Sequence, residues 1–194
     1  MQSEQKQNFR LILASGSPRR RELLARMGYT FEILVPDVDE HVKGPAREVV
    51  GVLSLRKAEA AAEQLSDGIV IASDTLVSLN GEALGKPADA ADARRMLREL
   101  SGNTHEVFTG VTLIDAATGR AESRVVRTGV RFRTLGDEEI SAYIRTGEPM
   151  DKAGAYAIQG GAHGFVEALD GSYENVIGFP VEDVRELLEK FTKE

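Results

Sequence analysis

The chain alternates short apolar runs rich in β-branched residues with longer segments in which apolar residues recur at helical spacing. Runs of the first kind indicate strands, and the helical spacing indicates helices that bury one face. The apolar runs predict strands at residues 11–14, 31–35 and 69–72. The periodic segments predict helices at residues 18–27, 46–65, 90–100 and 138–145, and a final helix that Pro180 opens.

The later part of the chain carries signals for hairpins. Asn80-Gly81 is a strong two-residue turn signal, and Asp170-Gly171 marks a second turn between apolar segments. Between these two turns lie two long segments with the character of antiparallel strands, joined by a loop at residues 116–119. The strand pairs expected here are residues 77–84 around the first turn, 106–115 with 122–133, and 165–169 with 173–177.

The order of the elements is mixed, because strands alternate with helices first and hairpins follow. This order favours an α/β fold with a long, twisted mixed sheet flanked by helices, rather than a simple doubly wound sheet. We expect two lobes with a central cleft between them. At 194 residues the chain is expected to form a single domain over residues 10–194, preceded by a flexible N-terminus at residues 1–9.

Composition and charge exclude several classes of protein. The chain has no cysteine, and therefore no disulfide, thiolate zinc site or cysteine nucleophile. Its formal net charge of −7 argues against nucleic acid as a partner, because such binding depends on neutralising phosphates. No segment reaches the length of a membrane span, and the polar start is not a signal peptide. We therefore expect a cytoplasmic protein with no membrane partner.

The most distinctive segment is Ser-Gly-Ser-Pro-Arg-Arg at residues 15–20, which joins the first strand to the first helix. Ser17 suits the N-cap and Pro18 the first helical position. Arginines in the first turn oppose the helix dipole, which favours anions there, so this pair is expected to meet an anion. The alternative is a solvated basic face. Hydroxyls, N–H groups and guanidinium groups converging on one point suit a phosphate. The candidate ligands are Ser15, Ser17, Arg19 and Arg20.

Two carboxylates are candidates for chemistry. Asp74 follows the apolar run that ends at residue 73, and open α/β sheets place ligands just past the ends of buried strands. The alternative for Asp74 is a turn or capping aspartate. Glu40 lies in an acidic loop, for which plain solvation is the alternative. A triphosphate approaching both carboxylates would need Mg²⁺ or Mn²⁺ between them to neutralise charge.

Three lysines are candidates for phosphate contacts, although a lysine is normally a solvated surface charge. Lys57 lies in the predicted helix at residues 46–65, and Lys152 follows an aspartate. Lys86 is held between a glycine and a proline, which restrict the backbone and favour an aimed side chain.

The three histidines and the absence of a phosphate-loop motif argue against several kinds of catalytic site. His41, His105 and His163 show no metal-ligand spacing, and a structural hydrogen bond is the expected role of His105. No Ser/His/Asp triad is legible in the sequence. The chain also lacks the glycine-rich sequence of P-loop nucleotide hydrolases.

A series of motifs beyond residues 15–20 runs along nearly the whole chain from residue 10 onward. These motifs are Asp74-Thr75, Gly85-Lys86-Pro87, Leu100-Ser101-Gly102-Asn103-Thr104-His105, Gly147-Glu148-Pro149-Met150-Asp151-Lys152-Ala153-Gly154-Ala155-Tyr156, Ile158-Gln159-Gly160 and Gly171-Ser172-Tyr173. In content and order they resemble the Maf family of nucleoside triphosphate pyrophosphatases, whose signature near the N-terminus is Ser-x-Ser-Pro-Arg-Arg.

The resemblance implies a two-lobed fold similar to that of inosine triphosphate pyrophosphatases. It implies that Asp74 is the catalytic residue, which accepts the proton of the attacking water, and that Glu40 joins Asp74 on the metal side. It implies that Lys57, Lys86 and Lys152 contact the phosphates or the nucleophile. A homodimer is also implied, and the family is associated with arrest of cell division.

Three positions distinguish subgroups of this family. Arg19, Thr75 and Gln159 match the subgroup that acts on dTTP and UTP, whereas a large aromatic residue, a glutamine and a glutamate tend to stand there in the subgroup that acts on 7-methyl-GTP. The amide of Gln159 offers a donor and an acceptor to the imide edge of thymine or uracil. These three residues are therefore the expected specificity residues.

The expected reaction is metal-dependent hydrolysis of dTTP and UTP to the nucleoside monophosphate and pyrophosphate, which would serve to clean the nucleotide pool. Three alternatives stay open. The substrate is a modified pyrimidine triphosphate, or the protein is a nucleotide-binding regulator of cell division without turnover, or it is a phosphatase that removes only the terminal phosphate. The released product, pyrophosphate or orthophosphate, separates the last alternative from the expected reaction.

Overall fold

The computed structural model describes residues 7–193, and within them seven strands form one sheet. The strand order is β2-β1-β3-β5-β6-β7, with β4 paired to β3 beside this path. The strands are β1 (Leu11–Leu13), β2 (Glu32–Ile33), β3 (Ile69–Leu79), β4 (Glu82–Leu84), β5 (Thr104–Asp115), β6 (Ala121–Phe132) and β7 (Val166–Asp170).

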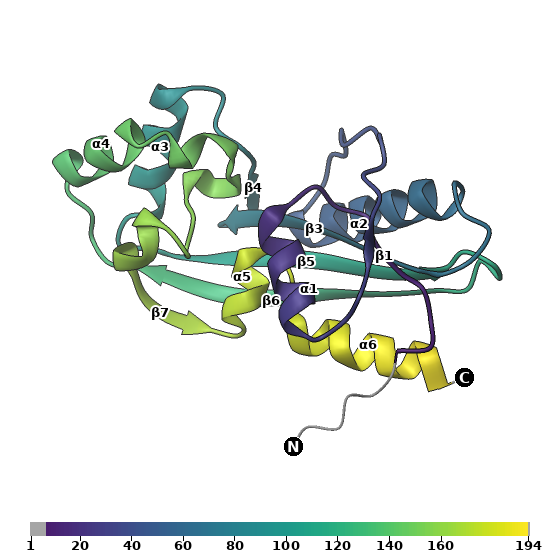
Figure 1. Ribbon diagram of the computed structural model, residues 1–194. Coiled ribbons are helices and arrows are strands. Elements are labelled where there is room, and N and C mark those ends of the chain that lie inside the picture. The colour runs from purple at the N-terminus through teal and green to yellow at the C-terminus, as the bar shows by residue number, and fades with distance from the viewer. Residues whose placement is uncertain (1–6, 194) are drawn as a thin grey trace, which may run out of the picture.

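Helices flank the sheet along its length (Figure 1). Between residues 7 and 193, none of them combines the length and the apolar character that crossing a membrane requires. The α-helices are α1 (Pro18–Arg26), α2 (Ala46–Ala62), α3 (Ala90–Leu100), α4 (Asp137–Arg145), α5 (Tyr173–Ile177) and α6 (Val181–Lys193). The 3₁₀ helices are η1 (Glu148–Asp151), η2 (Ala153–Ala155) and η3 (Gly161–Phe165).

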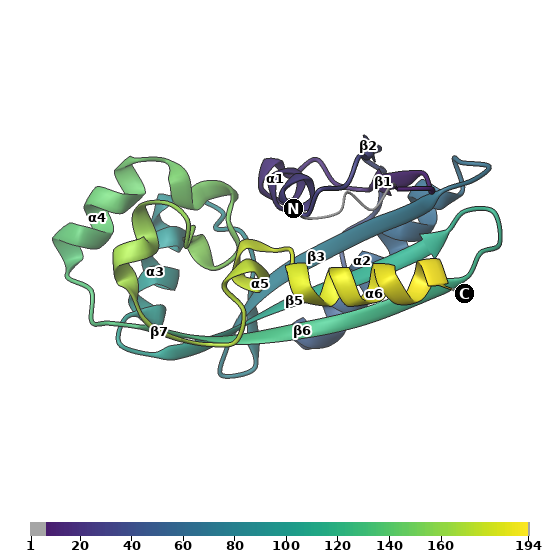
Figure 2. The ribbon, with the colours of Figure 1, turned by 60° about the horizontal axis from the view of Figure 1, so that its bottom comes forward.

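The sheet is mixed, as predicted. β1 pairs in parallel with β2 on one side and with β3 on the other, and the remaining pairs are antiparallel. β3 and β5 pair from Ile69 opposite Asp115 to Ser78 opposite Glu106. Together with β6 these strands form a long twisted ribbon that runs the length of the molecule (Figures 1 and 2).

Alternating residues of β3 explain how the helices cover the sheet, since successive side chains of a strand point to opposite faces. Val70 belongs to an apolar cluster with Ala61 of α2. Its neighbour Ile71 belongs to the main core with Leu23 of α1 and Leu187 of α6. Accordingly α2 and α6 lie on opposite sides of the strands (Figure 2).

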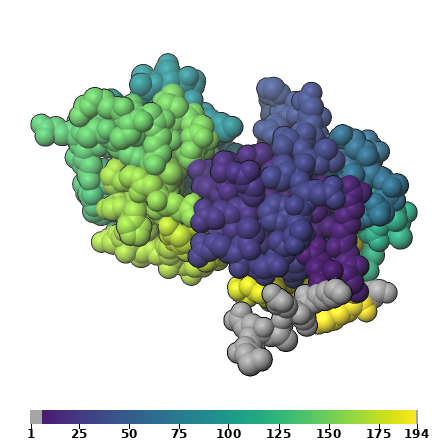
Figure 3. Space-filling view, in the orientation of Figure 1, coloured from purple at the N-terminus to yellow at the C-terminus, as the bar shows by residue number. Residues whose placement is uncertain are grey.

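The far end of the ribbon carries the second lobe, built from α3, α4 and the 3₁₀ helices (Figure 1). Its interior includes Leu97 of α3, Ile140 and Tyr143 of α4, and Phe165 of η3, all buried. In the space-filling view the surface is hollowed between this lobe and the lobe that contains α1 and α2 (Figure 3). The predicted two-lobed α/β architecture is therefore confirmed.

The prediction of a strand at residues 173–177 is wrong, because this segment is helix α5. The Ser172 hydroxyl caps the helix by accepting from the backbone N–H of Asn175 at 3.1 Å, and Gly178 ends it in the left-handed region. The β-branched and aromatic residues that suggested a strand instead anchor the helix to the core, where Ile177 is buried. β7 consequently pairs with β6 rather than with this segment.

The predicted strand at residues 69–72 is too short, because β3 continues to Leu79. Polar residues from Ser73 to Thr75 interrupt the apolar run, yet each pairs with a residue of β5. Cross-strand pairing therefore extends the strand through residues whose polarity had suggested its end. The predicted turn at Asn80-Gly81 joins β3 to β4, with both residues at positive φ.

The start of the described chain lies against the fold. Residues 1–6, part of the predicted flexible N-terminus at 1–9, lie outside the described residues. The amide of Gln7 donates to the carbonyl of Thr30 at 2.8 Å and accepts from its N–H at 2.9 Å. The ring of Phe9 lies 6.1 Å from that of Tyr29.

Candidate active site

A cavity of about 990 Å³ lies between the two lobes. One wall comes from the β1–α1 turn, α2 and β3, and the other from the segment after β4 and from η1 and η2. The candidate residues that line it are Ser15, Ser17, Arg19, Arg20, Glu40, Lys57, Asp74, Thr75, Lys86 and Lys152. Residues far apart in sequence thus meet in one space.

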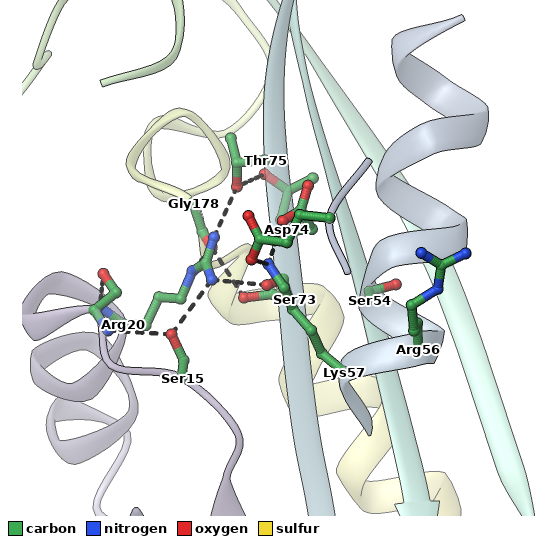
Figure 4. A network of polar contacts seen from close by, with 12 residues as sticks. Ser15, Arg20, Ser54, Arg56, Lys57, Ser73, Asp74, Thr75 and Gly178 are labelled. Atoms are coloured by element: carbon green, nitrogen blue, oxygen red, sulfur yellow. Dashed lines mark hydrogen bonds and ion pairs between the residues drawn. The ribbon is translucent and has the colours of Figure 1, made fainter. Parts of the chain in front are cut away.

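Lys57 holds two carboxylates together on the floor of this cavity. Its Nζ lies 2.7 Å from Oδ1 of Asp74 and 2.7 Å from Oε1 of Glu40. The side chains of Lys57 and Asp74 are only 13% and 12% exposed, whereas that of Glu40 is 59% exposed. The ammonium therefore fixes Asp74 from within the protein (Figure 4), and it also tethers Glu40 at the solvent side.

The position of Asp74 follows from the different lengths of two neighbouring strands. The pairing of β1 with β3 ends at Leu13 opposite Ile71, and the N–H of Ala14 then donates to the carbonyl of Ile71. Asp74 lies beyond that point on β3, where β3 is no longer paired with β1. The prediction that Asp74 follows a strand is corrected: it lies within β3 but just past the end of β1.

The loop that carries Glu40 is tied to the same helix as Lys57. Arg56 Nη1 donates to the carbonyl of Asp39 at 2.5 Å, and the neighbouring Lys57 holds the carboxylate of Glu40. The hydrogen bond from Lys57 lowers the pKa of Glu40, against the opposing effect of its partial burial. Glu40 is thus an anion at neutral pH.

The donor set suits a divalent cation that brings its own further ligands. One oxygen each of Glu40 and Asp74 contacts the ammonium of Lys57, and no described residue donates a hydrogen bond to Oδ2 of Asp74. Across residues 7–193, no group of three or more His, Asp or Glu side chains is gathered to hold a metal. Mg²⁺ commonly uses one or two carboxylates and completes its shell with water and substrate phosphates, so two carboxylates fit this mode.

Hydroxyls cluster at the start of α1. Ser17 is the N-cap, and its Oγ accepts from the N–H of Arg20 at 3.5 Å. Ser15 Oγ accepts from the N–H of Ser17 at 3.2 Å and from Nη1 of Arg20 at 3.3 Å. Because two donors occupy its oxygen, Ser15 has its hydroxyl proton left to donate into the cavity.

The guanidinium group of Arg20, which was predicted to bind phosphate, donates most of its hydrogen bonds to oxygens of the protein itself. Its Nε donates to the carbonyl of Gly178 at 3.0 Å and its Nη1 to that of Ser73 at 2.7 Å. Removal from solvent lowers the pKa of Arg20, and the charge of Asp74 opposes this effect. The guanidinium thus ties α1, β3 and the end of α5 together at the cavity wall (Figure 4).

A chain of hydroxyls orients Thr75. Thr109 Oγ1 donates to the carbonyl of Asn175 at 3.0 Å and lies 2.9 Å from Oγ1 of Thr75. Since the Thr109 proton is already used, Thr75 donates to Thr109, and Thr75 also accepts from Nη2 of Arg20 at 3.4 Å. Thr75 is left with a single lone pair, so it can only accept a hydrogen bond from a ligand.

Gln159 lies in a second, smaller cavity of about 210 Å³ that shares residues with the first. Arg19, Lys152 and Tyr156 line both cavities, so the two spaces adjoin. The three expected specificity residues are therefore distributed: Thr75 lines the larger cavity, Gln159 the smaller, and Arg19 both. The smaller cavity also has apolar walls from Ile158 and Ile177.

Sequence reasoning missed part of these walls. Tyr156, Val176 and Ile177 line both cavities, but the first was quoted only as part of a motif and the others lie in the segment predicted as a strand. Because residues 173–177 were predicted as a strand and not as helix α5, Val176 and Ile177 were not expected at the cavity wall. Arg56 was also missed, because nothing in its sequence surroundings distinguishes it from a solvated helix residue.

His105 makes the predicted structural hydrogen bond. It is buried, and its Nε2 lies 2.8 Å from the hydroxyl of Tyr156. Burial lowers the pKa of His105 to about 4, so its ring is neutral at pH 7. His105 therefore supports the cavity wall from behind.

Comparison with known proteins agrees with this architecture. Residues 10–191 match the family described as Maf-like protein. A protein named dTTP/UTP pyrophosphatase from Pelotomaculum thermopropionicum is 50% identical over 184 residues, covering 93% of this chain and 96% of that protein. Proteins of the same name from Vibrio cholerae and Geobacter metallireducens are 48% and 50% identical, covering 94% and 92% of this chain and 98% and 96% of their own lengths. This chain belongs to the Maf-like protein family.

Proposed function

We propose that this protein hydrolyses dTTP and UTP to the nucleoside monophosphate and pyrophosphate. The observation that carries the proposal is the pair of carboxylates, Glu40 and Asp74, joined by Lys57 in a cavity whose walls bear arginine and lysine. The names of the similar proteins, which are 48% to 50% identical, support the same reaction and the same two substrates.

Asp74 is proposed as the general base. One of its oxygens accepts from Lys57, and the other, Oδ2, is open to accept the proton of a water molecule. That water attacks the α-phosphorus, the bond from this phosphorus to the bridging oxygen breaks, and pyrophosphate leaves. The ammonium of Lys57 keeps Asp74 aimed, which a base within hydrogen-bond reach of its water requires.

The basic and hydroxyl groups of the cavity are proposed to bind the phosphate chain. Ser15 has a free proton to donate, and Lys86 is exposed on the wall of the opposite lobe. Arg19 and Lys152 lie where the two cavities adjoin. Donors and cations placed in this way stabilise the charge that develops on the leaving pyrophosphate.

A divalent cation, Mg²⁺ or Mn²⁺, is proposed as the cofactor. The carboxylates of Glu40 and Asp74 would hold it, and when bound it would neutralise charge on the phosphates. Glu40 is suited to this role because its pKa is lowered and its side chain reaches the solvent side of the cavity.

The base is proposed to lie in the smaller cavity against Gln159. An amide presents a donor and an acceptor side by side, as does the imide edge of thymine or uracil. The size of this cavity, about 210 Å³, and its apolar walls from Ile158 and Ile177 suit a single pyrimidine ring rather than a hydrated ion.

The test is a panel of nucleoside triphosphates incubated with the protein and Mg²⁺ or Mn²⁺. We expect dTTP and UTP to be the preferred substrates, each yielding equal amounts of monophosphate and pyrophosphate. Release of orthophosphate would instead indicate a phosphatase. Nucleotide binding without turnover, by folded protein, would favour a regulatory role of the kind associated with cell division.

The setting of the reaction is also a proposal. Nucleotide pools are cytoplasmic, and a cysteine-free chain suits that compartment. We further propose that the chain acts on free nucleotides rather than on nucleic acid, and that it forms a homodimer. Light scattering of the purified protein measures its mass directly against the 21.1 kDa of one chain.

A further inference from the structure

Gln159 is carried by a tight turn rather than by a helix or strand. The turn spans residues 157–160, and the N–H of Gly160 donates to the carbonyl of Ala157 at 3.0 Å. Gln159 itself is exposed at the turn's tip. A residue in such a position is poorly ordered unless side chains from elsewhere hold the turn.

Two side chains hold this turn, one on each side of Gln159. The N–H of Ala157 donates to the hydroxyl of Tyr143 at 2.9 Å. The N–H of Gly161 donates to Oε2 of Glu148 at 2.9 Å. Tyr143 is buried on α4 and Glu148 begins η1, so both come from regular elements of the second lobe.

The turn also packs directly on these two side chains. A Cβ atom added to Gly160 would lie 2.0 Å from Oε1 of Glu148, and one added to Gly161 would lie 3.0 Å from Cε2 of Tyr143. Two consecutive glycines thus let the backbone approach the carboxylate and the ring more closely than other residues permit.

Tyr143 and Glu148 restrain the two ends of the turn separately. The hydroxyl of Tyr143 accepts from the N–H of Ala157, and the carboxylate of Glu148 accepts from the N–H of Gly161. Burial raises the pKa of Tyr143, so its hydroxyl stays protonated. The backbone on each side of Gln159 is thus held by a side chain from a regular element.

We infer that Glu148 and Tyr143 are positioning residues for pyrimidine selection, acting through Gln159. This inference rests on the proposed function, because it assumes that Gln159 reads the base. An amide discriminates between base edges only when it is held to within about 0.5 Å. Tyr143 and Glu148 supply that restraint from the second lobe, one at each end of the turn.

The experiment measures kcat and KM for dTTP and UTP in Glu148→Ala and Tyr143→Phe, each alone and combined with Gln159→Ala. We expect each single variant to raise KM about 10-fold while kcat changes less than about 3-fold, since the lysine and carboxylates that act on the phosphates are untouched. In the Gln159→Ala background neither change should raise KM further, because residues that act through one group do not add their effects.

Controls separate positioning from general damage to the fold. Glu138→Ala alters an exposed glutamate on α4, and Tyr29→Phe removes the hydroxyl of a tyrosine that lines neither cavity. Both should leave KM unchanged. Glu148→Gln keeps one acceptor for the N–H of Gly161 and should restore most of the lost affinity. If Glu148→Ala fails to fold, Glu148→Gln and Tyr143→Phe, which removes a single oxygen, still test the inference.

The outcomes distinguish the inference from the proposed function. No turnover of dTTP by the unmodified protein would overturn the proposed function. Full turnover with an unchanged KM in Tyr143→Phe and Glu148→Ala would overturn the inference alone. Losses that multiply in the Gln159→Ala background would also overturn it, since Glu148 and Tyr143 would then act independently of Gln159.

Discussion

Lys57 decides the chemical character of the candidate site, because a single buried ammonium contacts both Asp74 and Glu40 at 2.7 Å. The two carboxylates and the ammonium of this cluster together carry a net negative charge, which favours a divalent cation beside them. Removing the lysine would leave the carboxyl group of Asp74, which is only 12% exposed, without its partner, an arrangement that costs free energy. The same residue therefore serves folding and catalysis.

Replacing the proposed base provides the most direct test at this scale. Asp74→Asn keeps the size of the side chain but cannot accept the proton of the attacking water. We expect turnover of dTTP to fall about 10²- to 10⁴-fold. The melting temperature should change little, because Lys57 keeps Glu40 as its partner.

The matched control is Asp67→Asn, which alters an exposed carboxylate paired with Arg10 at the surface. Its turnover should equal that of the unmodified protein, as measured by pyrophosphate release. A fully active Asp74→Asn protein would mean that another group accepts the proton.

Gln159→Glu changes the hydrogen-bonding character of the base cavity without changing its size. A carboxylate only accepts, so it cannot pair with both the N–H and the carbonyl of thymine or uracil. We expect kcat/KM for dTTP to fall about 10-fold or more, with an unchanged melting temperature. Gln64→Glu, at an exposed position of the segment after α2, is the control. Equal kinetics in the two variants would remove Gln159 from base selection.

His105 links stability to pH. Its folded-state pKa of about 4 lies below the ordinary value of about 6.5, so the unfolded chain binds a proton first as the pH falls. The stability that the neutral ring contributes is complete above pH 6.5 and is lost progressively toward pH 4. Between pH 7 and pH 5 this single group should cost about 2 kcal/mol.

Urea unfolding at the two pH values measures this loss. In His105→Gln the fall in the free energy of unfolding between pH 7 and pH 5 should be smaller by about that amount. His163→Gln, at an exposed position, should keep the pH dependence of the unmodified protein. An identical pH dependence in all three proteins would show that His105 does not titrate in this range.

At the scale of elements, a close approach of two backbones joins α2 to β5. A Cβ atom on Gly110 would lie 2.2 Å from the carbonyl oxygen of Val50 and 2.9 Å from Oγ of Ser54. The backbone of α2 therefore rests on the strand at this glycine. This contact sets the height of α2 above the sheet, and with it the position of Lys57 relative to Asp74.

Gly110→Ala should consequently destabilise the protein by ~3 kcal/mol or more, since a helix carbonyl cannot rotate away as a side chain would. Urea unfolding measures the change in midpoint. Gly136→Ala is the control, because a Cβ there meets nothing within 4 Å and the residue has an ordinary negative φ. Equal midpoints for the two variants would contradict close packing of α2 on β5.

Helices and turns were predicted correctly where the residues of a segment all favoured the same local structure. The helices α3 and α6 have apolar residues at regular helical spacing, and the Asn80-Gly81 turn has both residues at positive φ, as such turns require. It failed at residues 173–177, where the side chains favour a strand but the cap at Ser172 and the stop at Gly178 favour a helix. Local capping and burial of Ile177 prevailed over intrinsic strand propensity.

At the scale of the whole molecule, the candidate site is built by two lobes that share one ribbon of strands. Ser15 and Lys57 come from one lobe, and Lys86, Lys152 and Gln159 come from the other. A ligand that contacts both walls would link the lobes and stabilise the folded state as a unit.

This arrangement predicts a large thermal shift on ligand binding. With Mg²⁺ and a dTTP analogue carrying nitrogen in place of the α,β-bridging oxygen, at about 100 times its Kd, the gain is about 2.7 kcal/mol. The melting temperature should therefore rise by roughly 5–10 °C. Calorimetry measures this shift, and the same concentration of inorganic phosphate should produce a much smaller one. Equal shifts would mean that the ligand contacts only the phosphate-binding wall.

The sequence by itself determined the alternation of apolar runs, the turn and cap residues, and the chemical groups available to a site, because these depend on neighbours along the chain. It therefore sufficed to name most of the polar and charged residues that line the two cavities. Only the tertiary structure decided that β3 continues past Asp74, that Arg20 spends its donors on the carbonyls of Ser73 and Gly178, and that Glu148 and Tyr143 hold the turn of Gln159. Each of these depends on partners distant in sequence, and contacts of that kind exist only once the two lobes have folded around the sheet.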